Sequence, residues 1–344
     1  MPPKKPALEK THIVEIFCES LPYTIHQTCW VPTSRRFVSV GSRPRATGAL
    51  QVYKTKMGES KNLEKVLDIE TENSIRCATF SASDPIQRNV AIGDYKGNLS
   101  TFDLNSGSTK PLFSRKIHDD IINCIDGGSA PGPCEIVTAS RDGKVCVCDL
   151  RSEDPVVAVL APEGEKRDCW SVSVGGTSGP SERSVVCGYD NGDLKLWDLK
   201  SNSVTWETNL RNGISAIQFS DPNGSLQRVT AGCLSGQIVT FDLSEKPEGK
   251  GYASFQQKVK DSATVWVIQH CPQRRDVIAT TGGSGELLIW RKQKKALEYD
   301  QISSSLLSTQ PISSFNWHPD KEGLAVMSAY DQTVRIALVT HLKE

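Results

Sequence analysis

The sequence predicts an all-β protein built as a single seven-bladed β-propeller that is closed by an N-terminal strand. Three observations support this fold class. A glycine followed five places later by an apolar residue recurs along the chain at intervals of 44 to 49 residues. Each interval is long enough for four short strands and their turns. One further strand-like segment precedes the first repeat, where it can complete the last blade.

The clearest repeat lies at Cys169–Lys200. A short apolar strand there leads into a second strand at Ser184–Gly188, and a third strand ends in Trp197 and an aspartate. Asn191 and Gly192 form the turn between the second and third strands, because both residue types tolerate the positive φ of a tight hairpin. A glycine turn followed by a Trp-Asp ending is typical of a WD-repeat (WD40) blade.

Seven such repeats fill the chain, and Gln332 stands in the glycine position of the last one. The apolar residues that end the repeats are Tyr53, Phe102, Cys148, Trp197, Phe241, Trp290 and Ala337. The length alone would allow two domains. Because blades of one period close into one ring, we expect a single domain over residues 11–344.

The chain in order supports this assignment. Residues 1–10 are rich in proline and lysine, and we expect a disordered tail. Thr11–Cys18 alternates like a strand and should pair as the outermost strand of the last blade. An apolar-x-x-apolar-x-large pattern predicts the innermost strands Ile25–Trp30, Ile75–Phe80, Ile122–Gly127, Cys169–Val174, Ile214–Phe219, Val265–His270 and Ile312–Trp317.

The remaining strands follow from shorter apolar runs between turn residues. Second strands are predicted near Phe37–Gly41, Asn89–Gly93, Glu135–Ala139, Ser184–Gly188, Gln227–Gly232, Asp276–Thr280 and Gly323–Ser328. Weaker outer strands include Val156–Leu160, Ser203–Thr208 and Ala253–Gln257. Alternation is imperfect, as expected for strands covered by a sheet on either side.

WD-repeat blades are often held by a network of a His, a Ser or Thr, an Asp and the Trp. The third blade has His118 and Asp142, but Cys148 replaces the tryptophan. The fourth has Trp197 without such a histidine, and Asn191 takes the aspartate position. We therefore expect apolar packing between blades to supply most of the stability.

Composition excludes several function classes. The 40 Lys and Arg residues balance 40 Asp and Glu residues, so no net field favours nucleic acid or an anionic membrane. The longest apolar run, Val156–Ala161, is too short to span a bilayer, and the N-terminus does not resemble a secretory signal. Eleven cysteines, an odd number without paired spacing, indicate free thiols in a reducing compartment. We expect a cytoplasmic protein without a metal or other cofactor.

Catalytic motifs are absent from the sequence, including the nucleophile elbow, the phosphate-binding loop and the dinucleotide fingerprint. Gly282–Gly285 resembles a glycine loop, but it lies at a hairpin turn without a following helix. The six histidines are scattered among the blades. We therefore expect that the protein is not an enzyme.

Binding of proteins is the expected role of such a scaffold, and the ring geometry narrows the site. In WD-repeat proteins, the turns between second and third strands share the narrower face with the starts of the innermost strands. Aromatic and arginine side chains dominate interface hot spots. The candidate protein-binding residues on this narrow face are Arg76, Tyr95, Arg141, Trp170, Asp190, Trp266 and Tyr330. For Trp170 and Trp266, packing between blades is the alternative interpretation.

Several segments resemble one known family beyond the general WD-repeat pattern. They are Glu135–Val145, Glu165–Val172, Val185–Leu199, Thr205–Gly213, Leu307–Leu324 and Tyr330–Ile336. These segments closely resemble the Monad family of WD-repeat proteins, also called dynein axonemal assembly factors. The resemblance extends over essentially the whole chain, apart from a short segment before the seventh blade and the N-terminal tail.

The resemblance implies a non-enzymatic scaffold or adaptor. Such a protein would associate with a co-chaperone assembly of prefoldin-like and RuvB-like ATPase subunits and support cytoplasmic preassembly of axonemal dynein arms. It would act as a monomer within the larger complex. One alternative is a propeller that recognises a short peptide or modified tail, such as a degron or histone segment. Another is a stable subunit of a permanent complex.

Overall fold

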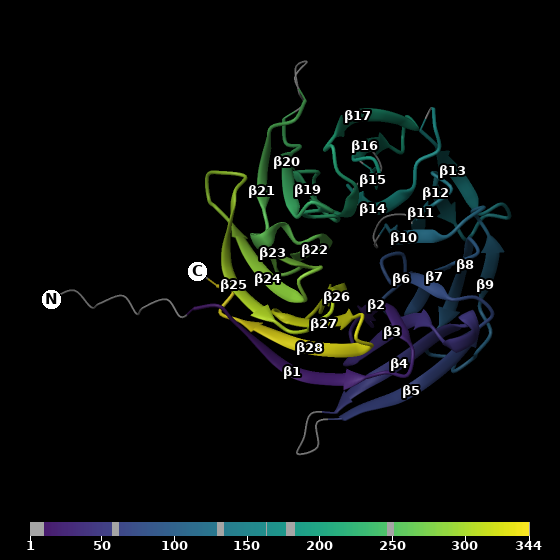
Figure 1. Cartoon of the computed structure of the whole chain (residues 1–344). Coiled ribbons are helices and arrows are strands. Elements are labelled where there is room, and N and C mark those ends of the chain that lie inside the picture. The colour runs from purple at the N-terminus through teal and green to yellow at the C-terminus, as the bar shows by residue number, and fades with distance from the viewer. Residues whose placement is uncertain are drawn as a thin grey trace.

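The computed structural model describes residues 10–56, 62–128, 134–162, 164–176, 183–245 and 251–343. Over these residues the chain forms 28 strands, two short 3-10 turns and no α-helix. The strands make seven four-stranded antiparallel sheets arranged around a central axis (Figure 1). The predicted seven-bladed propeller is therefore confirmed. Nine of the ten residues in the expected tail, 1–9, lie outside the described residues.

Each blade contributes one strand to each of four concentric positions (Figure 1). The innermost strands are β2 (Thr24–Trp30), β6 (Ile75–Thr79), β10 (Ile122–Gly127), β14 (Cys169–Gly175), β18 (Ile214–Phe219), β22 (Val265–Cys271) and β26 (Ile312–Trp317). The second strands are β3 (Arg36–Ser42), β7 (Asn89–Asp94), β11 (Glu135–Ser140), β15 (Ser184–Tyr189), β19 (Arg228–Cys233), β23 (Arg274–Gly282) and β27 (Leu324–Ala329).

The third and outermost strands complete the blades in the same order. The third strands are β4 (Gly48–Lys56), β8 (Asn98–Asp103), β12 (Val145–Asp149), β16 (Asp193–Asp198), β20 (Gln237–Asp242), β24 (Glu286–Lys292) and β28 (Thr333–Thr340). The outermost strands are β5 (Asn62–Thr71), β9 (Phe113–Lys116), β13 (Val156–Leu160), β17 (Ser203–Asn209), β21 (Ser254–Lys258), β25 (Tyr299–Leu306) and β1 (His12–Ser20).

Strand β1 closes the ring. It pairs antiparallel with β28 from His12 opposite Thr340 to Ser20 opposite Thr333, with one bulge after Glu15. Glu15 also forms an ion pair of 2.8 Å with Arg335. The seventh blade therefore contains both ends of the described chain (Figure 1), which confirms the predicted closure by an N-terminal strand.

Apolar packing between neighbouring blades forms the core. One buried cluster joins Val40 and Leu50 of the first blade to Ile75 and Ile92 of the second. Equivalent clusters lie between the other blades, including the pair that meets across the closure. Because each sheet is sandwiched between two others, its central strands bury both faces.

Polar side chains on the innermost strands add a second link between blades. At six of the seven blade boundaries a side-chain oxygen accepts a hydrogen bond of 2.6 to 3.4 Å from a backbone N–H of the next innermost strand. The acceptor and donor residues are Gln27 and Ala78, Asp126 and Val174, Ser173 and Phe219, Gln218 and His270, Gln269 and Trp317, and Asn316 and Trp30. The boundary between blades seven and one has a second such bond, from the Thr28 N–H to the Ser314 hydroxyl oxygen at 2.8 Å. Five of these acceptors occupy the variable position before the last residue of the innermost-strand pattern. This position therefore links neighbouring blades at five of the seven boundaries.

Candidate protein-binding face

The turns between second and third strands build the narrow face. Gly192 has φ of +89°, and a Cβ there would lie 2.7 Å from the backbone nitrogen of Asn212, so the turn requires glycine. Glycines in the second, third, fifth and sixth blades share this conformation, and Gln332 adopts it in the seventh. The first blade instead uses a longer turn that contains the 3-10 residues Pro44–Ala46.

The seven candidate residues differ in exposure. Arg141 and Tyr330 are exposed, whereas Tyr95 and Asp190 are half-buried despite their position at turn tips. Arg76, Trp170 and Trp266 are also half-buried, at the start of their innermost strands. The seven residues fall into two groups, one on blades six, seven and two and the other on blades three and four.

The first group contains Arg76 and three aromatic residues that make contacts between blades. The rings of Trp266 and Tyr330 meet edge to face, with centroids 5.2 Å apart, across the boundary between blades six and seven. The Tyr95 hydroxyl lies 3.3 Å from Nε2 of His26 on the first blade, and their ring centroids are 5.5 Å apart. Arg76 lies on the same blade as Tyr95. Two aromatic contacts on the narrow face thus each join neighbouring blades.

The charge of Arg76 influences two residues of these aromatic pairs. Burial and the positive charge of Arg76 lower the pKa of the His26 imidazole to about 4, so the ring is neutral at physiological pH. Burial raises the pKa of the Tyr330 hydroxyl, and Arg76 acts in the opposite direction. Sequence reasoning did not select His26 as a binding residue, although the position of His26 matches that of Arg76 on its own strand.

The second group is dominated by carboxylates. Nε of Arg141 lies 3.6 Å from Oδ2 of Asp168 and 4.0 Å from Oδ2 of Asp120, and its side chain is 55% exposed. Such an exposed pair contributes little to stability. The backbone N–H of Asp190 donates to the carbonyl of Asp168 at 3.0 Å. Among the described residues, Oδ1 of Asp190 is buried without a hydrogen-bond partner.

Trp170 fits the packing interpretation. A Cβ added to Gly213, in the loop before β18, would lie 2.5 Å from the Trp170 ring and 2.8 Å from the Asp190 carbonyl. The indole therefore packs against a glycine of the next blade. Its contribution to this face is to hold blades four and five together beside the Asp190 turn.

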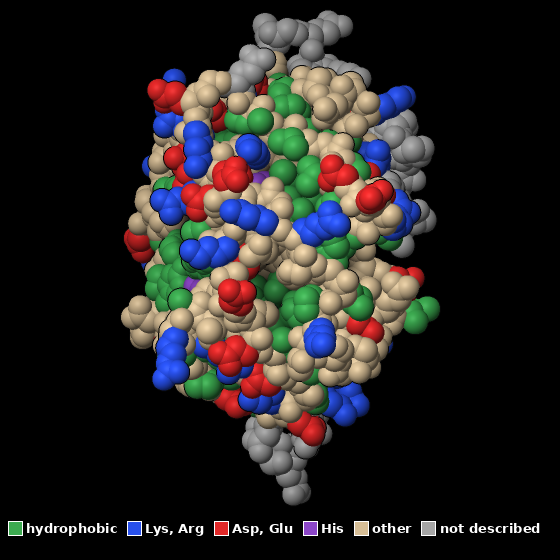
Figure 2. All heavy atoms as spheres, turned by 90° about the vertical axis from the view of Figure 1, so that its right-hand side faces the viewer, with side chains coloured by type: hydrophobic (Ala, Val, Ile, Leu, Met, Phe, Trp, Pro, Cys, Tyr) green, Lys and Arg blue, Asp and Glu red, His purple; other side chains and the backbone are tan. Residues whose placement is uncertain are grey.

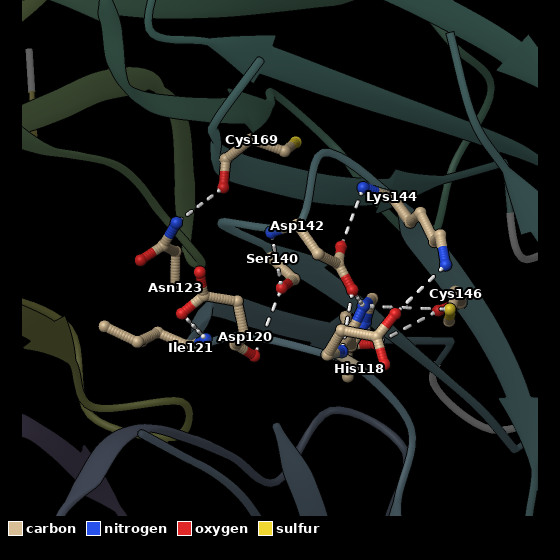
Figure 3. A network of polar contacts seen from close by, with 11 residues as sticks. His118, Asp120, Ile121, Asn123, Ser140, Asp142, Lys144, Cys146 and Cys169 are labelled. Atoms are coloured by element: carbon tan, nitrogen blue, oxygen red, sulfur yellow. Dashed lines mark hydrogen bonds and ion pairs between the residues drawn. The ribbon is translucent and has the colours of Figure 1, made fainter. Parts of the chain in front are cut away.

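A buried polar network supports the turn that carries Arg141 (Figure 3). Nδ1 of His118 lies 2.9 Å from Oδ2 of Asp142, and Nε2 lies 2.8 Å from the Thr138 hydroxyl. The side chains of His118 and Asp142 are 0% and 4% exposed. Sequence reasoning found both residues but not Thr138. Its place in the predicted second strand, where the network uses Ser or Thr, was the available signal.

The network shifts the acidity of Asp142. Burial acts to raise the pKa of Asp142, but the hydrogen bond and electrostatic attraction from His118 outweigh it. The N–H groups of Lys144 and Asp119 also donate to this carboxylate, at 2.9 and 3.0 Å. The pKa of Asp142 therefore lies well below its usual range. Nearby, Asn123 donates to the carbonyl of Cys169 at 2.9 Å and joins this blade to the fourth (Figure 3).

The outer rim offers a contrasting surface. Figure 2 shows the side of the ring where β9 and β13 lie, with basic and acidic side chains interspersed and hydrophobic side chains exposed between them. Val157 and Val159 of β13 are 50% and 47% exposed. Among the seven outermost strands, β13 is the one without a polar side chain. Exposed apolar residues therefore also occur on the rim.

The described residues contain no group of three or more His, Cys, Asp or Glu side chains placed to hold a metal ion. None of the helical turns found in this part of the chain is long and apolar enough to cross a membrane.

The comparisons with known proteins agree with the blade architecture. The family described as WD domain, G-beta repeat matches residues 109–149, which include β9 to β12. Together with the seven blades, this match defines a WD-repeat propeller.

Similarity to individual proteins covers nearly the whole chain. Dynein axonemal assembly factor 10 of Xenopus laevis is 44% identical over 97% of this chain and 98% of its own length. The human and Chlamydomonas reinhardtii proteins of the same name are 40% and 38% identical, over 98% and 97% of this chain and 99% and 98% of their own lengths. The chain therefore belongs to the dynein axonemal assembly factor 10 family, which confirms the resemblance found in its sequence.

Proposed function

We propose that this chain is a non-enzymatic scaffold in a co-chaperone assembly that contains prefoldin-like and RuvB-like ATPase subunits. In this role it supports cytoplasmic preassembly of axonemal dynein arms and acts as a monomer within the larger complex. The observation that carries the proposal is the similarity to dynein axonemal assembly factors across all seven blades, at 38 to 44% identity. We therefore expect the function that this chain shares with these relatives to reside in the propeller.

We assign partner binding to the narrow face. Aromatic and arginine side chains combine large buried area with hydrogen bonding, and they dominate interface energetics. Tyr95, Trp266 and Tyr330 supply such side chains on this face, and Arg76 is the second residue of β6. Arg141 projects from another part beside two carboxylates. The narrow face thus offers both anchor residues and charge.

Affinity purification from ciliated and non-ciliated cells, followed by mass spectrometry, tests the assembly. Recovery of prefoldin-like and RuvB-like subunits, with axonemal dynein chains in ciliated cells, supports the proposed role. Recovery of ubiquitin ligase or chromatin subunits in their place would favour recognition of a degron or histone tail. A single stoichiometric partner set in both cell types would favour a permanent complex.

A pair of variants tests the binding face. Replacing Arg141 and Tyr330 together by Ala should weaken partner binding by about 2 kcal/mol or more. Both side chains are exposed, so the free energy of unfolding should change by less than about 1 kcal/mol. The matched control replaces Lys294 and Lys295, two exposed residues between β24 and β25, by Glu. Partner binding that survives the first variant and is lost in the second contradicts the narrow-face assignment.

A further inference from the structure

Strand β13 forms the outer edge of the third blade. It pairs with β12 on one side, and among the described residues no strand pairs with its other side. A free edge presents backbone N–H and C=O groups to any extended chain, and proteins usually protect such edges with charged or polar side chains. The side chains on each outermost strand therefore decide where a further strand can add.

One position in the outermost strands distinguishes β13 from the others. This outer position lies opposite the third-strand residue two places before the apolar end of each repeat, which is Cys146 in blade three. In blade order, the residues at the outer position are Asp68, Ser114, Val159, Glu207, Gln256, Ser304 and Cys18. Val159 is the aliphatic member of this set, so β13 lacks the charged or polar side chain that protects most of the other edges.

The first blade shows what a protected edge looks like. Asp68 at the outer position forms an ion pair of 2.7 Å with Lys65. Lys65 and Val156 occupy matching positions, because each lies opposite the apolar residue that ends its repeat. The two residues that carry this ion pair in blade one are thus Val156 and Val159 in blade three. Blade three replaces a charged edge by an aliphatic one.

The apolar side chains of this edge are exposed to solvent. Val157 and Val159 are 50% and 47% exposed, and Leu112, directly before β9 on the neighbouring blade, is 62% exposed. This side of the ring shows hydrophobic side chains between charged ones (Figure 2). Ala158 and Leu160 pack into the core between blades three and four, so the strand is held in place. A fixed strand with exposed apolar side chains and a free edge suits the alternating side chains of an added strand.

Carboxylates mark one end of the edge. Glu153 and Asp154 are exposed and precede β13, separated from it by one proline. Arg115 of β9 donates to the backbone carbonyl of Glu153 at 3.3 Å. Among the described residues, no basic side chain lies within ion-pair distance of the Glu153 or Asp154 carboxylate. A strand with basic residues at this end would complement their charge.

We propose that β13 is a strand-addition site for an extended segment of a partner protein, in which alternating apolar residues are followed by lysine or arginine. An antiparallel strand continues the pattern of the blade, and its C-terminal end then lies beside Glu153 and Asp154. The backbone hydrogen bonds supply affinity, and the valines and carboxylates select the sequence. This inference goes beyond the proposed function, because it concerns the outer edge of blade three and not the turns of the narrow face.

Binding of synthetic peptides to the full chain tests the site. The probe is acetyl-Val-Thr-Val-Thr-Val-Lys-Lys-amide, and the reversed peptide is acetyl-Lys-Lys-Val-Thr-Val-Thr-Val-amide. We expect saturable binding of the probe that slows amide hydrogen exchange in the segment containing β13, measured by mass spectrometry. The reversed peptide should bind about threefold more weakly, because its lysines lie away from the two carboxylates.

Two further peptides test whether the backbone of the probe pairs with β13. Each has the sequence of the probe and carries N-methyl groups on one of the two alternating sets of backbone nitrogens. Only one set faces β13 in an added strand, since successive residues of a strand direct their N–H groups to opposite edges. We expect one methylated peptide to lose binding and the other to retain it. Equal binding of both would show that side chains alone hold the probe, which contradicts strand addition.

Matched variants separate the edge from general effects of charge. Val157→Lys and Val159→Lys should each weaken binding of the probe about tenfold or more, because a charge then blocks the edge. The control is Val66→Lys. Val66 of β5 is 43% exposed and occupies the bulged position that Val157 occupies in β13. It should leave probe binding unchanged, and the melting temperatures of all three variants should stay close to that of the wild type.

A charge-neutral variant tests the direction of the added strand. In Glu153→Gln combined with Asp154→Asn, the probe and the reversed peptide should bind equally. A preference for the probe that persists in this variant contradicts the role of the two carboxylates.

Four other results would overturn the inference. They are no saturable binding of the probe, unchanged binding in Val157→Lys and Val159→Lys, equal weakening in Val66→Lys, and protection from exchange that excludes β13. A wild-type dimer in light scattering that Val159→Lys converts to a monomer would also overturn it, because a second copy of this chain would then occupy the edge. Failure of the narrow-face assignment is distinguishable, since probe binding at β13 would remain.

Discussion

Blades three and four are neighbours with the same strand pattern, yet they hold their central turn in different ways. Blade three links Asp142 of the turn to His118 and Thr138 through buried hydrogen bonds. In blade four, Asn191 and Cys187 occupy the positions of Asp142 and Thr138. Blade three therefore uses a buried polar network, and blade four uses local hydrogen bonds with apolar and sulfur contacts.

The contacts within blade four show how the polar network is replaced. Asn191 accepts from the backbone N–H of Asp193 at 3.1 Å, so its turn is held locally. The Tyr189 hydroxyl lies 3.6 Å from Sγ of Cys187, and both residues are buried. The comparison teaches that one hairpin geometry tolerates either solution. A buried polar network is the more fragile one, because the loss of one member orphans the others.

The largest effect should come from Asp142→Ala. This change leaves the buried His118 ring and the N–H groups of Asp119 and Lys144 without their acceptor. We expect the free energy of unfolding to fall by about 3 kcal/mol. The matched variant Asn191→Ala should cost about 1 kcal/mol or less, because its turn is partly exposed. Equal losses in urea unfolding of the two variants would remove the distinction between the blades.

The pH dependence of stability sharpens the same difference. The folded-state pKa of Asp142 lies below its unfolded value, so its contribution is fully present above the unfolded pKa of about 4. That contribution is lost as the pH falls through the folded pKa. The melting temperature of the wild type should therefore approach that of Asp142→Asn below about pH 4. A difference between the two proteins that stays constant from pH 7 to pH 3 contradicts this origin.

Smaller effects are expected in the fourth blade. The indole N–H of Trp197 has no acceptor among the described residues, whereas Trp290 of blade six donates to the Thr280 hydroxyl at 2.9 Å. Cys187 occupies the position of Thr280.

Cys187→Ser should therefore change the free energy of unfolding by less than about 1 kcal/mol, since a new acceptor offsets lost sulfur packing. Thr280→Ala, which removes such an acceptor, should cost about 1 kcal/mol. A fall in the free energy of unfolding for Cys187→Ser as large as that for Asp142→Ala would contradict the view that apolar and sulfur contacts hold blade four.

The smallest effect concerns thiol reactivity in the native protein. Cys18 and Cys134 are exposed and should react first with a thiol reagent, while Cys146 and Cys187 are buried and should stay protected. In Asp142→Ala, the loosened third blade should make Cys146 reactive and leave Cys187 protected. Mass spectrometry of labelled peptides measures both rates. Unchanged protection of Cys146 would show that the third blade stays closed without its network.

Features that depend on a few adjacent residues could be predicted from the sequence. The turn at Asn191 and Gly192 follows from backbone conformation, and the repeat spacing shows how many such turns the chain contains. The innermost strands at Ile122–Gly127, Ile214–Phe219 and Ile312–Trp317 match their predicted bounds, because alternating apolar positions and turn residues limit each strand locally. The closing strand could be recognised for the same reason.

Contacts between blades could not be read in this way. The hydrogen bond from the His270 N–H to Gln218 joins residues one repeat apart, and the Trp30 N–H reaches Asn316 across the ring closure. The packing of Trp170 on Gly213 likewise depends on the position of the next sheet. Such contacts depend on how neighbouring sheets are rotated, and no local pattern encodes that rotation.

The candidate site likewise combines features that local sequence sets with contacts that depend on the packing of blades. The sequence by itself determined the repeat, the closure, the family and the residue types on the narrow face, because each depends on local pattern or direct similarity. Only the tertiary structure decided that Tyr95 contacts His26 and that Tyr330 contacts Trp266. Each contact joins two neighbouring blades, so it depends on how adjacent sheets pack.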